Sequence, residues 1–442
     1  MLADGALKEH TLNRLGYGPS KWHADRYDEV GHAAYVAEQL ADSLPAISDN
    51  GTETVTKLDR SILSRRQLET VLIDFWFNHF NIDTLDTAPD KRDNTIAGRM
   101  VGYHQNTAIK PHVLGLFGDM LVATAKSPSM LDYLDNRINY EAEVVNNVEY
   151  GLNENYAREI MELHTLGVGG GYSEEDVTEV ARILTGWSVN SDAFRFKNAR
   201  HDHGEKNVMG VNYPAGRREE EGLEFLAFLA SHPSTAGYLS FKLSARFVND
   251  LPPGGAVGPA IGAYTASNGD LKAVMSAIIN SDAFIDEANF RAKAKPPHRY
   301  MASAILAMGA ETRSHYDGVR TETAEAIELC GEVPYVVADP TGYPEEAKFW
   351  ISGASMLTRF KTAESIAWDS TLRTRLKTRT GQNGANVAAT IDAIADAMVP
   401  GGLANTSLDA VAAHVAAVGS TNDERVSAAA QMVMSSPEFV RF

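Results

Sequence analysis

The sequence predicts a mainly α-helical protein, with a large multi-helix globular fold and at most a small β-hairpin near residues 194–211. Apolar residues recur at helical spacing along most of the chain. The alternation of strand and helix that marks parallel-sheet enzymes is missing, so a Rossmann or barrel fold is not expected. Hydrophobic residues make up 44% of the 442 residues and charged residues 22%, a balance typical of globular proteins with a large core.

The first predicted elements lie between residues 63 and 152. A helix is expected over 63–80, and a second over 111–126 with Pro111 in its first turn. Ser127-Pro128 ends that helix, and a short helix follows at 129–135. The asparagine-rich segment 135–152 is predicted to be a long loop. The apolar stripe of the first helix consists of Leu68, Val71, Leu72, Phe75, Trp76 and His79.

The segment 153–187 is the most informative part of the chain and predicts two helices joined by a glycine-rich turn. Asn153 is placed to cap a helix from Glu154 to about Leu166, and Gly167 is placed to end it. Ser173 and Asp176 form a capping-box pattern for the second helix, which is expected to reach Trp187. Beyond it, 194–197 and 207–211 are the best strand candidates for a short hairpin.

Helices are also predicted to dominate the rest of the chain. The segment 218–250 reads as helix, interrupted near His232-Pro233. The proline- and glycine-rich run from Asp250 to Gly255 marks a boundary. We therefore expect an N-terminal helical domain over 1–250 and a C-terminal helical region over 251–442 packed against it, or one continuous large domain. Later helices are expected at 255–267, 270–281, 297–310 and 321–331 and from 349 onward, with a loop over 333–347.

Composition excludes several classes of function. The net charge of −18 repels nucleic acid and anionic membranes, so neither is an expected partner. The single cysteine, Cys330, leaves no internal disulfide and no multi-cysteine metal site. Neither a membrane-spanning window nor an export signal is present, so a cytoplasmic location is expected, with an exported or periplasmic one as the alternative. No nucleotide-binding glycine motif occurs, so no nucleotide cofactor is expected.

A set of motifs follows in order along nearly the whole chain. They are LNRLGYGP at 12–19, DFWFNHFN at 74–81, PHVLGLFGDML at 111–121, SPSMLDYLDN at 127–136, the segment 153–187, HDHGEKNVMG at 201–210, HPSTAGYLSFKLSARFVNDLPP at 232–253 and DPTGYP at 339–344. This set resembles the bacterial family known as domain of unknown function 1800. The resemblance implies no activity. Many relatives look exported, and their genes often neighbour those of sulfatase-like proteins, an association with cell-envelope or polysaccharide biology.

The helix over 154–166 carries the first candidate site residues. Glu154, Arg158 and Glu162 lie four residues apart and can neutralise one another along one face. Glu159 lies off this stripe beside apolar neighbours, where an acid needs a partner or a raised pKa. His164 points at an apolar face, where a histidine is more often a hydrogen-bonded core residue than a ligand. If two of Glu159, Glu162 and His164 face one cavity, they could hold a metal or share a proton.

Other candidates lie on the helix over 63–80 and on a polar loop. His79 ends the apolar stripe and is either a core histidine or a base facing the central helix. A His-x-His pattern suits a metal when it lies on a strand, whereas polar surface loops usually have no such role. Amide side chains both donate and accept, so they suit sugar hydroxyls, although turns and caps explain them equally well. The loop residues are His201, Asp202, His203 and Lys206, and the amides are Asn78, Asn81, Asn153 and Asn155.

Two functional hypotheses follow. The first is a metal-assisted hydrolase or oxidoreductase acting on a polar, glycan-like substrate, with a divalent or redox metal ion. Its catalytic residues would be His79, Glu159, Arg158 and Lys206, its metal ligands His164, Glu162, His201, Asp202 and His203, and its substrate-binding residues Asn78, Asn81, Asn153 and Asn155. The second is a non-catalytic helical scaffold that binds a partner, such as a sulfatase-like protein, and whose buried polar groups fix helix packing.

Overall fold

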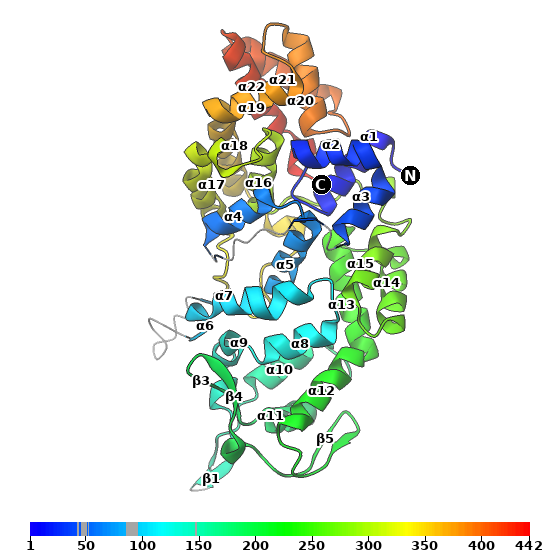
Figure 1. The fold of residues 1–442 in the computed structure, drawn as a ribbon, viewed down its shortest axis with the longest axis vertical. Coiled ribbons are helices and arrows are strands. Elements are labelled where there is room, and N and C mark those ends of the chain that lie inside the picture. Colours follow the sequence, from blue (N-terminus) through cyan, green and yellow to red (C-terminus); the bar gives the residue numbers. More distant parts are fainter. Residues whose placement is uncertain (42–43, 46–50, 52, 85–95, 146–147) are drawn as a thin grey trace.

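Helices make up most of the computed structural model, which describes residues 1–41, 44–45, 51, 53–84, 96–145 and 148–442 (Figure 1). The mainly α-helical prediction is therefore confirmed. In the view of Figure 1 the molecule is elongated, with the last helices of the chain at one end and the β-hairpins at the other. Across the described ranges, none of the helices has both the length and the apolar character needed to cross a lipid bilayer.

The N-terminal helices pack beside the C-terminal half of the chain. On the first of them, Glu9 forms an ion pair with Arg291 at 2.6 Å and accepts a hydrogen bond from the backbone of Gly401 at 2.8 Å. One hydrophobic core extends from Leu15 to Val440. Contacts therefore cross the boundary expected at residue 250. These first helices are α1 (Asp4–Arg14), α2 (Lys21–Val30), α3 (His32–Gln39) and α4 (Thr54–Leu63).

The helix predicted over 63–80 is α5 (Gln67–His79), which begins four residues later than expected and is separate from α4. The chain becomes extended at Ser64, with φ −69° and ψ 132°. The backbone N–H of Gln67 then donates to Oε1 of Gln39 at 2.9 Å, which satisfies a donor at the start of the new helix. Helix α5 is buried along most of its length, and its last residues reach the candidate site.

The helix predicted over 111–126 begins later, at α8 (Phe117–Ala125). Pro111 lies in a short 3-10 turn at Lys110–His112 instead. Leu116 is extended and forms a β-bridge with Asp270, so the helix cannot begin before it. The neighbouring short elements are α6 (Ile96–Arg99), α7 (Val101–Tyr103), a π-helix (His104–Ile109), α9 (Pro128–Tyr133) and a 3-10 turn (Asn136–Ile138).

Helices α10 (Asn155–Glu162) and α11 (Glu174–Ile183) form the predicted pair. The capping box of Ser173 and Asp176 is present. Both helices end earlier than predicted. After α10 the turns widen, because the N–H groups of His164 and Leu166 bond to carbonyls five residues earlier at 3.1 and 2.8 Å. This widening leaves the carbonyl of His164 free to face α5.

Three two-stranded antiparallel hairpins are described, where the sequence predicted at most one. The strand candidates near 194–197 and 207–211 do not pair with each other, because each pairs with its own neighbour across a two-residue turn. Both turns have positive φ at their central residues, as type I′ turns require. A hairpin also occupies part of the predicted loop 135–152. The strands are β1 (Glu143–Val145), β2 (Val148–Tyr150), β3 (Trp187–Asn190), β4 (Ala193–Phe196), β5 (Lys206–Val208) and β6 (Val211–Tyr213).

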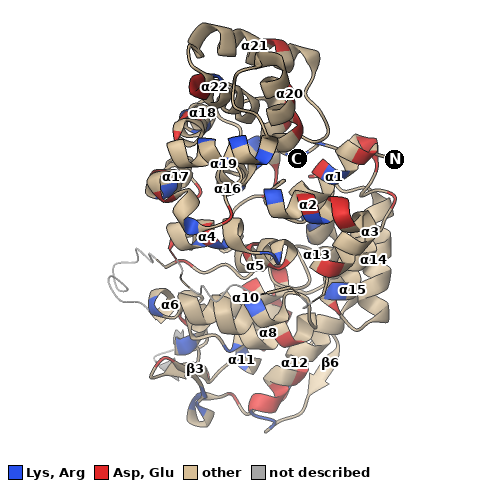
Figure 2. Ribbon diagram, turned by 45° about the horizontal axis from the view of Figure 1, so that its top comes forward, with Lys and Arg blue, Asp and Glu red and all other residues tan. Residues whose placement is uncertain are grey.

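The remaining chain is helical, and the predicted break at His232-Pro233 separates α12 from α13. Lys and Arg are interspersed with Asp and Glu over the helices seen in Figure 2. The helices are α12 (Glu219–Ser231), α13 (Pro233–Phe247), α14 (Gly254–Ala266), α15 (Leu271–Ile279), α16 (Pro297–Ala307), α17 (Asp317–Leu329), α18 (Gly353–Trp368), α19 (Ser370–Thr380), α20 (Val387–Met398), α21 (Asn405–Val418), α22 (Asn422–Met434) and α23 (Pro437–Val440).

Candidate functional site

A cavity of about 330 Å³ lies where the loop 333–347 meets α5 and α13. Its volume falls at the lower end of the range for small-molecule sites. The walls combine aromatic rings with a few polar groups, as such sites usually do. The wall residues that matter most for chemistry are Phe75, His79, Tyr238, Lys242, Tyr343 and Glu345.

Lys242 on α13 and His79 on α5 form a hydrogen-bonded pair in this cavity. The buried His79 ring donates from Nε2 to the carbonyl oxygen of His164 at 3.0 Å. Because a carbonyl can only accept, the hydrogen of the neutral ring lies on Nε2 and leaves Nδ1 as an acceptor. Nζ of Lys242 lies 3.0 Å from Nδ1 and 5.4 Å from the centre of the Tyr238 ring. The widened turn after α10 therefore fixes the tautomer of His79 and leaves its Nδ1 as the acceptor for Lys242.

Both members of the pair have lowered pKa values. Burial lowers the pKa of the Lys242 ammonium from 10.5 to about 8, although the Glu345 carboxylate acts in the opposite direction. Burial also lowers the pKa of His79 well below its usual range, and the charge of Lys242 lowers it further. The neutral imidazole of His79 therefore accepts a hydrogen bond from Lys242, and part of the Lys242 population is a neutral amine with a free lone pair near pH 8.

Asn78 and Asn81, predicted to bind substrate, hold the loop that covers the cavity. The Asn78 amide donates to the carbonyl of Tyr343 at 2.8 Å and accepts from its N–H at 2.7 Å. The Asn81 amide donates to the carbonyls of Val337 and Asp339 at 2.9 and 3.0 Å. Asn78 also lines the cavity, whereas Asn81 does not. The amide groups of both residues are thus engaged with the protein backbone.

Gly342 allows this loop to approach α5 closely. Its φ is +71°, and a Cβ atom there would lie 2.5 Å from the carbonyl oxygen of Asn78. Gly167, at the start of the glycine-rich turn, has φ +81°, and a Cβ atom there would lie 3.0 Å from the Tyr238 ring. Glycines in two predicted motifs therefore shape the walls of one cavity.

Arg158 lies on the surface and forms ion pairs outside the cavity. It makes two hydrogen bonds to Glu174 of α11, at 3.0 and 2.7 Å, and lies 3.6 Å from Glu154. Glu162 accepts a hydrogen bond from the Tyr172 hydroxyl at 3.2 Å instead of completing the predicted stripe. The self-neutralising stripe therefore forms only between Glu154 and Arg158, and α11 supplies the stronger partner.

Glu159 and His164 lie near the cavity without lining it. Burial raises the pKa of the Glu159 carboxyl, and the negative charges of Glu162 and Asp339 raise it further. The His164 ring is buried 5.0 Å from the Phe80 ring and 6.0 Å from the His79 ring, measured between centres. Burial lowers its pKa to about 3, so this histidine is a neutral core residue.

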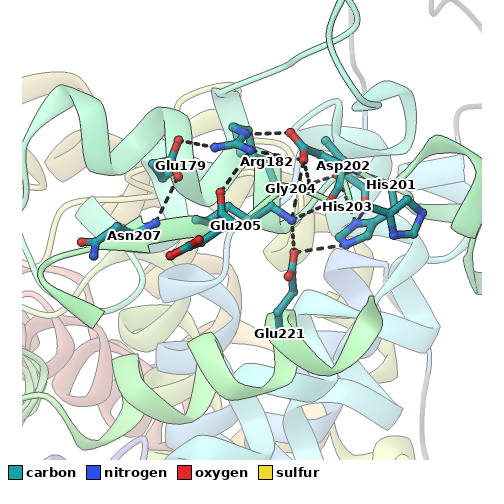
Figure 3. Close-up of polar contacts among 12 residues, drawn as sticks. Glu179, Arg182, His201, Asp202, His203, Gly204, Glu205, Asn207 and Glu221 are labelled. Carbon is teal, nitrogen blue, oxygen red and sulfur yellow. Dashed lines mark hydrogen bonds and ion pairs between the residues drawn. The ribbon is translucent and has the colours of Figure 1, made fainter. Parts of the chain in front are cut away.

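The 201–206 loop forms a separate buried network against α11 and α12 (Figure 3). Nζ of Lys206 lies 2.6 Å from Oε1 of Glu221, and Nε2 of His201 lies 3.1 Å from the same oxygen. Asp202 receives a hydrogen bond from Arg182 at 2.6 Å. The side chains of Lys206, His201 and Glu221 are fully buried.

The exposed His203 ring stacks edge-on against His201, and its Nε2 lies 3.2 Å from the carbonyl of Asn198. Among the described contacts of this loop, none reaches His79 or His164.

The five predicted metal ligands are therefore not brought together. Glu162 lies on α10, His164 lies in the core, and the loop ligands His201, Asp202 and His203 are anchored elsewhere by Arg182 and Glu221. Within the described ranges, no group of three or more His, Cys, Asp or Glu side chains is arranged to hold a metal ion.

Asn153 and Asn155 serve local structure. The side chain of Asn153 accepts the N–H of Asn155 at 3.0 Å at the start of α10, and its own N–H donates to Asn139 at 3.0 Å. The Asn155 side chain is exposed. The turn-and-cap explanation fits this geometry.

Sequence reasoning missed Lys242, Tyr238, Tyr343 and Glu345. The first two lie in the motif at 232–253, and the last two lie in or beside the motif at 339–344. These motifs were recognised, but nothing in either one shows that they meet. A lysine on a helix is ordinarily read as a solvated residue.

Comparison with known proteins identifies a family but no activity. A family model described as "Protein of unknown function (DUF1800)" matches residues 10–441, which confirms the resemblance over nearly the whole chain. No curated protein and no solved structure gave a significant match.

Proposed function

Because the chain belongs to the DUF1800 family, whose description assigns no activity, we propose from its own geometry that it is an enzyme acting on a polar, glycan-like small molecule. The observation that carries this proposal is the pair of Lys242 and His79 in a cavity of about 330 Å³. A lysine amine that is partly neutral near pH 8 is a competent general base.

The reaction step assigned to Lys242 is a proton transfer. The Nζ lone pair takes a proton from a substrate hydroxyl or an attacking water, so an O–H bond breaks and an N–H bond forms. The resulting ammonium gives the proton back to the leaving oxygen later in the cycle. A positioned group of this kind contributes about 10²- to 10⁴-fold to rate.

His79 acts as a positioning residue. Its Nε2–H is held by the carbonyl of His164, so Nδ1 always faces Lys242 as an acceptor. This bond fixes the amine at one point of the cavity in both of its protonation states. The positive charge of Lys242 disfavours a charged His79, so the imidazole does not compete for the proton.

The walls of the cavity support a polar substrate with apolar faces, such as a sugar. Tyr238, Phe241 and Tyr343 provide rings, while Thr341 and Glu345 provide groups that bond to hydroxyls. Phe241 is 44% exposed, which is high for a large apolar side chain next to a cavity. A bound ring would cover part of it.

Competitive labelling of lysines with acetic anhydride, read by mass spectrometry across pH 6–11, tests the reactive amine. Lys242 is expected to reach half of its maximal reactivity at a pH of about 8, whereas a lysine in water does so near 10.4. In His79→Leu the amine loses its acceptor, so the midpoint should shift. A Lys242 midpoint near 10.4, the value of a lysine in water, would contradict the proposal.

A panel of mono- and oligosaccharides tests the substrate class. Panel members are screened by ligand-observed NMR and for products by mass spectrometry. A substrate should protect Lys242 from labelling, and Lys242→Met should lower turnover by at least about 10²-fold while Lys348→Met leaves it unchanged. Turnover that survives Lys242→Met would remove this residue from the chemistry.

Two sequence-based hypotheses remain separate from this proposal. A divalent or redox metal stays a prediction, and elemental analysis of the purified protein tests it. A non-catalytic scaffold accounts for the buried network around Glu221, in which Lys206 and His201 both lie close to Oε1 of Glu221. It leaves unexplained why a lysine with a lowered pKa lines a cavity.

A further inference from the structure

A second, smaller cavity of about 60 Å³ adjoins the one at Lys242. The residues common to both walls are Phe75, Asn78, Tyr343, Pro344 and Glu345. One water molecule needs about 10–15 Å³ by this measure, so the smaller cavity has room for a group of several heavy atoms. The two cavities are therefore neighbours that share one wall.

Arg299 of α16 lines the small cavity and forms no direct ion pair within the described ranges, although the charges of Glu345 and Asp74 act on it from a greater distance. The residue is only 2% exposed. Its Nη1 donates to the carbonyls of Asn13 and Gly16, and within the described ranges its Nε has no hydrogen-bond partner. An arginine Nε always carries its hydrogen, so this is an unused donor. A buried charge without a carboxylate is costly unless something else compensates it.

Two more cations surround the same space. Arg246 pairs with Glu345 at 2.9 Å, but its Nε also has no partner in the described part of the chain. Nζ of Lys57 lies 3.4 Å from Oδ1 of Asp74. Burial, together with the charge of Arg246, lowers the pKa of Arg299 to about 9, so the cations repel one another.

The acidic groups of the small cavity are already engaged. Asp74 accepts a hydrogen bond from the Tyr17 hydroxyl in addition to its contact with Lys57. Glu332 accepts the N–H of His298 at 2.8 Å, and burial raises the pKa of its carboxyl, which favours the neutral form. A raised pKa weakens the repulsion that this carboxyl exerts on an anion.

We propose that the small cavity binds an oxyanion, such as a carboxylate, sulfate or phosphate group, through Arg299, Arg246 and Lys57. The inference rests on the proposed function in one respect, because it makes the substrate of Lys242 an acidic sugar-like molecule. Guanidinium donors favour such groups through charge-assisted hydrogen bonds. The anion supplies the charge that Arg299 lacks, and it fixes the body of the substrate in the large cavity beside Lys242.

Isothermal titration with sodium sulfate, sodium phosphate, glucuronate and glucose tests the site directly. At least one anion should bind, and the three anions identify which chemistry is preferred. If the carboxylate is the natural group, glucuronate should bind at least about tenfold more tightly than glucose. These measurements need no turnover.

Arg299→Gln should weaken anion binding by about tenfold or more. Arg359→Gln is the matched control, because Arg359 is equally buried and has an unpartnered Nε among the described residues, yet it lines neither cavity. If Arg299→Gln does not fold, the double variant Arg246→Gln, Glu345→Gln removes one cation together with its partner and should also weaken binding.

Each outcome decides one proposal. The inference is overturned if none of the three anions binds the wild-type protein, or if the Arg299 and Arg359 variants bind anions equally well. Anion binding that persists in Lys242→Met supports the site independently of catalysis. If anions bind but Lys242 is unreactive, only the proposed function is contradicted. If Lys242 is reactive but no anion binds, only this inference is contradicted.

Discussion

Replacing Lys242 by methionine should change how stability depends on pH. Lowering the pKa from 10.5 to about 8 corresponds to about 3 kcal/mol, at about 1.4 kcal/mol for each tenfold change in proton affinity. Lys242 is partly exposed, so screening by solvent reduces the expected value to about 2 kcal/mol. Methionine keeps most of the side-chain length and the contact with Tyr238 but does not titrate.

The sign of the effect follows from proton binding. Between pH 8 and pH 10.5 the unfolded chain keeps a proton on this lysine that the folded chain has released. The free energy of unfolding contributed by Lys242 therefore rises with pH in this window and is constant below it. Wild-type protein should gain about 2 kcal/mol over Lys242→Met as the pH increases from 7 to 10.5.

Urea unfolding of both proteins at half-unit pH steps measures this difference. Titration of all other groups is common to the two proteins and cancels. Lys348→Met, at a side chain that is 69% exposed, is the control for removing a lysine charge from the surface. A wild-type minus Lys242→Met difference that stays flat from pH 7 to 10.5 would refute the lowered pKa and, with it, the reactive amine.

Three further outcomes follow from the described contacts. Glu221→Gln should destabilise the protein by about 3–5 kcal/mol in urea unfolding, because the buried Lys206 ammonium loses its nearer carboxylate and keeps only Asp202 at 3.9 Å; a change below about 1 kcal/mol would show that the network contributes little stability. Gly342→Ala should lower the thermal midpoint and ligand binding together, since the new Cβ meets the carbonyl of Asn78 and φ is positive; unchanged binding would mean that the loop does not shape the cavity. Arg158→Ala should leave turnover unchanged and stability within about 1 kcal/mol, because its ion pairs are exposed; a large loss of turnover would restore its predicted catalytic role.

Local signals in the sequence predicted local structure well. The capping box at Ser173 and the break at Pro233 depend on residues a few positions apart, so the pattern alone contains the information. The start of α5 depends on Gln39, and the start of α8 depends on Asp270. These partners are distant in the chain, and no short-range pattern reveals them.

In the candidate site too, local patterns predicted some residues, and contacts between distant parts of the chain determined the others. His79 was found because an apolar stripe ends on it, but Lys242 was not, because its burial comes from a loop about a hundred residues further along. The metal hypothesis needed the 201–206 loop to lie close to His79 and His164. Instead, Asp202 of this loop pairs with Arg182, and Lys206 pairs with Glu221. Polar composition predicted that these residues matter to the structure without indicating which of them share a cavity.

The two hydrogen bonds between Asn78 and Tyr343 join an early helix to a loop that is synthesised much later. The floor of the cavity is made by α5 and α13, whereas its cover is made by residues 340–346. A ribosome that has released only the first 250 residues therefore presents the lysine and histidine without their enclosure, in contact with water. An amine that is solvated keeps an ordinary proton affinity. Lys242 therefore acquires its lowered pKa only once the late loop has docked.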